Sequence, residues 1–74
     1  MHNLPPMQTV DPQITDIEDR AKAAKIPMTA ILTDADVQAS TWWRWRHAKA
    51  EPRLATLRKV RQALETRLAE QAAA

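Results

Sequence analysis

Residues 28–48 read MTAILTDADVQASTWWRWRHA, and the spacing of side chains in this run carries most of the information on the fold. Apolar side chains recur in it at three- and four-residue spacing, which is typical of α-helices. Asp36 and the two residues after it interrupt this pattern. We therefore expect two short helices, over about 28–35 and 39–48, joined by a three-residue turn. The second helix would carry every aromatic side chain of a sequence with three Trp, no Phe and no Tyr.

The three tryptophans are predicted to divide between two faces of the second helix. At 100° per residue Trp42 and Trp45 share one face, whereas Trp43 falls on the other. A small core without Phe needs large side chains, so we predict that Trp42 and Trp45 are buried. Their predicted neighbours are Ile31, Val37 and Leu57.

Trp43 is predicted to point outward together with Ser40, Arg44 and His47. An exposed indole is unfavourable in a free monomer, which suggests contact with a partner. Arg44 can form bidentate hydrogen bonds with guanine, and Trp43 offers an apolar plane to thymine methyl groups or sugars. The competing interpretations are that Trp43 lies flat against a neighbouring helix or forms a dimer contact.

The rest of the 74-residue chain contains no glycine and five prolines, so prolines are expected to separate the helices. Asp11 and Pro12 are a typical helix start, and Pro27 ends that first helix at about Lys25. Residues 1–10 are expected to form a flexible tail. A last helix of about 18 residues is expected to begin at Glu51-Pro52, and its predicted apolar stripe contains Leu54, Leu57, Val60, Leu64 and Leu68. The sequence thus predicts a compact all-α, four-helix domain over residues 11–74.

The last helix also bears on assembly. Leu64 and Leu68 continue its apolar stripe beyond what a small monomeric core requires, so we expect them to contact a second copy of the chain. The alternative is that Leu68 covers the first helix or the N-terminal tail of its own chain.

Charge is unevenly distributed although the formal net charge is only +2. Six acidic and three basic side chains lie in residues 1–38, whereas eight basic and three acidic side chains lie in residues 39–74. The basic half is where a polyanion would bind. A solvated helical surface would explain the same residues.

Several function classes find no support in the composition. Cysteine is absent and the only histidines, His2 and His47, are far apart, so we expect no metal site and no cofactor. Without glycine there is no phosphate-binding loop, and Ser40 has no evident base, so we expect no enzyme. There is no apolar run of about 20 residues and no signal-like start. These features favour a soluble cytoplasmic protein that does not enter a membrane.

Residues 26–64 resemble the lambda-repressor-like (XRE/Cro-type) helix-turn-helix family of phage and bacterial transcription regulators. The family's spacing is kept without a gap, and the matching residues are Ile26, Ile31, Val37, Ser40, Thr41, Trp42, Arg44, Trp45, Pro52, Leu54, Thr56, Leu57, Val60, Ala63 and Leu64. The resemblance implies a lambda-repressor-like fold with its motif at about 28–48. It also implies a sequence-specific DNA-binding regulator, of the phage or prophage repressor type, encoded by a bacterium or a phage.

The resemblance further implies which residues touch DNA, with the helix of about 39–48 inserted in the major groove. The implied base-reading positions are Gln38, Ala39, Ser40, Trp43 and Arg44. The implied phosphate contacts are Thr41, Lys49 and Arg53, to which side-chain chemistry adds Arg46 and His47. The expected partner is double-stranded DNA, with a homodimer on a pseudo-palindromic operator that places two recognition helices roughly 34 Å apart.

Three departures from the family pattern affect these expectations. Asp36 replaces the turn glycine, which normally needs a positive φ, and Asp tolerates that conformation better than most residues. Ala48 replaces the glycine that ends the recognition helix, so that helix is expected to run on or to end without a left-handed cap. The family's arginine–glutamate pair is replaced by Ala21 and Arg46, which frees Arg46 for a phosphate or for Asp16, Glu18 or Asp19.

The alternative function is a protein-interaction or antitoxin-like module that reuses the fold.

Overall fold

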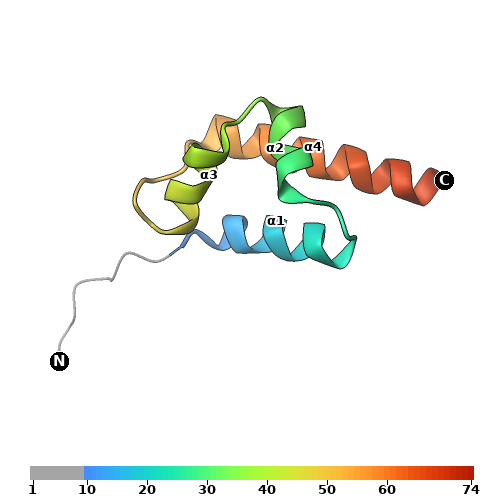
Figure 1. Cartoon of the computed structure of the whole chain (residues 1–74), viewed down its shortest axis with the longest axis horizontal. Helices are drawn as coiled ribbons and strands as arrows, with labels where there is room; N and C mark the ends of the chain where they lie inside the picture. The colour runs from blue at the N-terminus through green and yellow to red at the C-terminus, as the bar shows by residue number, and fades with distance from the viewer. Residues whose placement is uncertain (1–9) are drawn as a thin grey trace.

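The computed structural model describes residues 10–74, and the regular structure within them is entirely α-helical (Figure 1). The chain forms four helices: α1 (Pro12–Ala23), α2 (Met28–Ala35), α3 (Ala39–Arg46) and α4 (Leu54–Ala73). This confirms the prediction of a compact all-α domain with a long last helix. The expected flexible tail lies outside the described residues except for Val10, which is half-buried against the core. None of the described helices is both long and apolar enough to cross a lipid bilayer.

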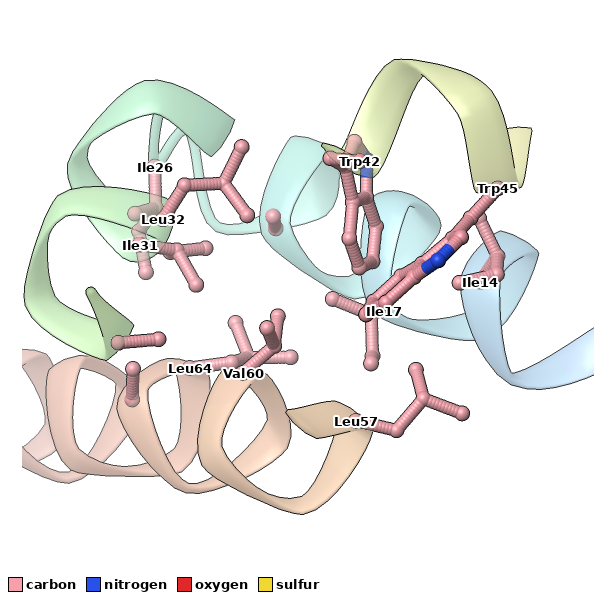
Figure 2. Packing of buried hydrophobic residues seen from close by; sticks show 13 residues of the cluster. Ile14, Ile17, Ile26, Ile31, Leu32, Trp42, Trp45, Leu57, Val60 and Leu64 are labelled. Carbon is pink, nitrogen blue, oxygen red and sulfur yellow. The ribbon is translucent and has the colours of Figure 1, made fainter. Parts of the chain in front are cut away.

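The long helix α4 makes the most extensive packing contacts of the domain. It packs against α1 and α2, and α3 packs against α1. Figure 2 shows the side chains of α4 on one side of the core and the two tryptophans of α3 directed toward α1. The buried cluster consists of Ile14, Ile17, Ala21, Ile26, Ile31, Leu32, Ala35, Trp42, Trp45, Leu57, Val60, Ala63 and Leu64.

The predicted division of the tryptophans is confirmed. Trp42 and Trp45 are only 4% and 5% exposed, whereas Trp43 between them is 51% exposed. The rings of Trp42 and Trp45 lie 5.9 Å apart at a tilt of 58°, an arrangement that aromatic pairs favour. Two neighbouring positions of α3 therefore have opposite tasks, one in the core and one on the surface.

Three helices end in a left-handed residue that is not glycine. Lys25, Asp36 and Ala48 have φ values of 60°, 58° and 57° and follow α1, α2 and α3. After each of them the next backbone N–H donates a hydrogen bond to the carbonyl five residues back, as from Val37 to Leu32 at 2.9 Å. This is the Schellman arrangement, which satisfies carbonyls at the helix end and turns the chain sharply.

The end of α3 corrects one prediction. We expected the missing glycine at position 48 to lengthen this helix or to remove its left-handed cap. Instead α3 ends at Arg46, and Ala48 adopts the left-handed conformation. The backbone N–H of Lys49 donates to the Arg44 carbonyl at 2.7 Å, so the cap forms despite the strain at Ala48.

The start of α4 also differs from expectation. The helix begins at Leu54 with Arg53 as an extended N-cap residue, so Pro52 lies before the helix instead of in its first turn. Leu54, which we placed on the buried stripe, is 57% exposed because it is the first helical residue and lies beyond the core. The rest of the predicted stripe is buried or half-buried.

The outer part of α4 is fastened to the shorter helices by polar contacts. Arg67 donates two hydrogen bonds to the Asp34 carboxylate, at 2.5 and 3.2 Å, and Gln71 donates to the Ala24 carbonyl at 2.9 Å. The hydrogen bonds from Arg67 lower the pKa of the Asp34 carboxyl below its usual value. These contacts hold α4 to the end of α2 and to the turn after α1.

We predict that Ala48→Gly stabilises the domain, since glycine removes the clash that an L-residue suffers at positive φ, worth roughly 1–2 kcal/mol before the entropy lost by glycine. Ala30→Gly, inside α2, is the matched control and should destabilise the domain by about 1 kcal/mol or more. Urea unfolding measures both. A loss of stability in Ala48→Gly would show that residue 48 is not left-handed.

Candidate nucleic-acid interface

The outward face of α3 gathers the five predicted base-reading residues. Gln38 is the N-cap residue of this helix, and Ala39 and Ser40 form the start of its first turn. All three are exposed, as are Trp43 and Arg44 one turn further on. Among the described residues no side chain caps this N-terminus. The face therefore presents an amide, a hydroxyl, an indole and a guanidinium to whatever approaches α3.

Trp43 is half-exposed and lines a groove with residues of α1 and α2, among them Asp19 and Met28. Its ring stacks on His47, with ring centroids 4.2 Å apart and an interplanar angle of 34°. The two residues are one helical turn apart, so this pair forms on the surface of α3 itself. The contact covers one side of the indole and gives Trp43 a fixed orientation while it stays half-exposed.

A shallow groove beside this face brings several predicted DNA contacts together. It runs between the turn after α2, the middle of α3 and the start of α4. Gln38, Thr41, Arg44 and Arg53 all line it, which places two predicted base-reading residues next to two predicted phosphate contacts. Lys59 lines the same groove and adds positive charge, and Asp36 and Glu51 at its edges are its acidic residues.

Lys49 and Arg53 lie on the segment between α3 and α4, and both are exposed. Thr41 is half-buried on α3. Cationic side chains therefore follow the C-terminal end of α3 and precede α4. Their exposure leaves them available to an anion.

Arg46 has a different environment from the other predicted phosphate contacts. Its Nε lies 3.1 Å from Oε2 of Glu18 on α1, in an ion pair. The same carboxylate oxygen accepts a hydrogen bond of 2.9 Å from the indole Nε1 of Trp42. We predicted that Arg46 contacts either a phosphate or an acidic residue of the first helix. In the structure of the chain by itself, it pairs with the acidic residue Glu18.

Sequence reasoning named Glu18 as one of three acids within reach of Arg46 but missed its bond to Trp42. A signal for it was present, because a buried indole N–H usually needs an acceptor. Glu18 follows the buried Ile17 and so lies at the margin of the inward face of α1. Only the packing of α3 on α1 determines which acid meets the indole.

The two predicted dimer residues have separate outcomes. Leu64 is fully buried by the helices of its own chain, so the prediction that it contacts a second copy is wrong. It belongs to the buried cluster on the side of α4 that packs against α1 and α2. Leu68 is half-buried and packs against the same core, so part of its surface stays open to a second copy.

Residues 10–74 contain no group of three His, Asp or Glu side chains arranged to hold a metal ion. Comparison of the chain with protein-family models, with curated protein sequences and with solved structures finds no match.

We predict that substitution of the neighbouring residues Trp42 and Trp43 changes the free energy of unfolding by very different amounts. Trp42→Ala removes a buried ring and its hydrogen bond and should cost about 3–5 kcal/mol, enough to abolish cooperative folding of so small a domain. Trp43→Ala, the matched control, should change the free energy of unfolding by at most about 1 kcal/mol. Urea unfolding followed by far-UV circular dichroism measures both, and equal effects would contradict the two-faced arrangement of α3.

Proposed function

We propose that the chain is a sequence-specific DNA-binding transcription regulator of the lambda-repressor-like helix-turn-helix type. In this proposal α2 and α3 form the helix-turn-helix motif, α3 enters the major groove, and the protein acts as a repressor by occupying operator DNA. The observation that carries the proposal is the outward face of α3. There Gln38, Ser40, Trp43 and Arg44 are exposed together while Trp42 and Trp45 hold the helix from behind.

The chemistry of this face suits base edges. Arg44 can donate to the two acceptors of guanine, O6 and N7. The Gln38 amide can donate to N7 of adenine and accept from its N6 amino group, and Ser40 can bond either a base or a phosphate. The exposed ring of Trp43 suits the thymine methyl group, and Ala39 is small enough to let the backbone approach the groove. An exposed indole held by a stacked histidine costs little entropy to bring into contact with a ligand.

Phosphate contacts are assigned to residues around the face. Lys49 and Arg53 supply charge and Thr41 a hydroxyl, and His47 supplies a hydrogen bond beside Trp43. Arg53 lines the same groove as Arg44, so one approaching strand meets both a base-reading and a phosphate-binding side chain. Arg46 is left out of this set because Glu18 occupies it.

A homodimer on a pseudo-palindromic operator remains part of the proposal, because two-fold binding doubles the contact made by one short helix. Leu64 has no part in it, and Leu68 offers only its exposed portion. Salt dependence tests this directly. Lys49 and Arg53 on two copies predict a log–log slope of affinity on salt of about −3.6, whereas one copy predicts about −1.8.

The second candidate function is a protein-interaction module. Trp43 and Leu54 are the exposed large hydrophobic residues of the described chain, and apolar anchors of this size are typical of protein interfaces. That function predicts no enriched duplex and little dependence of partner affinity on salt.

The test is a selection of binding sites from random duplexes, followed by affinity measurements over a range of salt concentrations. We expect an enriched motif, about a tenfold or greater loss of preference for it in Arg44→Ala, and an unchanged salt slope in that variant. Lys49→Ala should weaken binding to all sequences alike and lower the slope by about 0.9 for each bound copy.

Arg58→Ala serves as the control for lost charge, because Arg58 is exposed on α4 and lines a separate groove with Asp34 and Thr66. It should leave the preference for the selected duplex unchanged. Full binding of that duplex by both Trp43→Ala and Arg44→Ala would refute the assignment of the reading face.

A further inference from the structure

One carboxylate oxygen on α1 holds two side chains of α3. Oε2 of Glu18 accepts the hydrogen bond from the Trp42 indole and pairs with the Arg46 guanidinium, at 2.9 and 3.1 Å. The Glu18 side chain is only 25% exposed, so this charge is partly shielded from water, while that of Arg46 is 56% exposed. These contacts fix both the roll of α3 about its axis and the charge at its C-terminal end.

We propose that Glu18 is a positioning residue that orients α3 through Trp42 and, by neutralising Arg46, lowers the affinity of the protein for DNA. The inference rests on the proposed DNA-binding function and adds to it a residue on α1 that touches no base. Arg46 lies at the end of the reading helix, where an unpaired arginine would add a phosphate contact.

The Glu18 carboxylate and a DNA phosphate compete for the Arg46 guanidinium. A guanidinium already paired with a carboxylate gains little from a phosphate and displaces few counterions from DNA. Glu18 and Asp19 also line the groove beside Trp43 and Arg46, together with one further cation, Lys22. A phosphate that approaches Arg46 therefore meets two negative charges, of which Lys22 can offset at most one. Because Arg46 does not contribute a phosphate contact, a larger share of the affinity for DNA depends on the bases that α3 reads.

The experiment compares wild type with Glu18→Gln, which keeps an oxygen for the Trp42 indole but loses the charge. We expect affinity for both the selected duplex and unrelated duplexes to rise roughly fivefold, the equivalent of one exposed ion pair. The salt slope should steepen by about 0.9 for each bound copy, because Arg46 now contacts a phosphate. The double variant Glu18→Gln/Arg46→Gln should return the slope to that of wild type.

Asp19→Asn is the matched control, since Asp19 is the next residue on α1 and lines the same groove. It removes the same charge without releasing Arg46, so it should leave the salt slope unchanged. An unchanged slope in Glu18→Gln, or an equal change in Asp19→Asn, overturns the inference while the binding of DNA by wild type stands. A wild type that binds no duplex refutes the proposed function itself and with it the withheld contact of Arg46.

The orienting role is measured without DNA, from the three indole N–H resonances in a proton–nitrogen NMR spectrum. Glu18→Ala should move the Trp42 resonance, identified by its absence in Trp42→Phe, whereas Glu18→Gln should largely preserve it. A Trp42 resonance that stays in place in Glu18→Ala would show that Glu18 does not hold the indole.

Discussion

The structure depends on the burial of two indoles from one short helix, α3, which packs against α1. With no Phe or Tyr available, Trp42 and Trp45 supply the largest side chains of the core and tie an eight-residue helix to the domain. A helix of this length is not stable alone, so its orientation is set by what its inner face buries. Because Glu18 also holds the Trp42 indole, the inner face fixes the rotation of the outer one.

The same constraint explains the turns. Three left-handed residues that are not glycine each cost free energy, and each lies one or two residues after a helix whose inner face is buried. At two of these turns the residue after the left-handed one is itself apolar and packs on the core, Ile26 after α1 and Val37 after α2. Packing therefore compensates for backbone strain, and the turn between α2 and α3 keeps a fixed geometry without glycine.

Much of this was predictable from periodicity and from proline positions. The bounds of α2, the burial of Trp42 and Trp45 and the exposure of Trp43 follow from side-chain spacing, because each depends only on the local helix. The left-handed conformation of Ala48 was not predictable, since the intrinsic preference of alanine opposes it. Leu54 and Leu64 show the same limit, because whether an apolar residue faces the core or solvent depends on where neighbouring helices end.

In the candidate site, too, the features set by local helix geometry were predictable, and the one set by a long-range contact was not. The exposed residues of α3 were predicted as a set from their positions on the helix, and the stacking of Trp43 on His47 agrees with their one-turn spacing. The pairing of Arg46 with Glu18 requires contact between residues 28 positions apart in the sequence, so the sequence could only offer a choice of acids.

We propose that α3 has one face that packs in the core and one that binds DNA. The most direct test is to follow the indole N–H resonances while a selected duplex is added to the protein. We predict that the Trp43 resonance shifts or broadens as DNA binds while those of Trp42 and Trp45 stay nearly in place. A duplex that moves Trp42 and Trp45 but leaves Trp43 unchanged would contradict it.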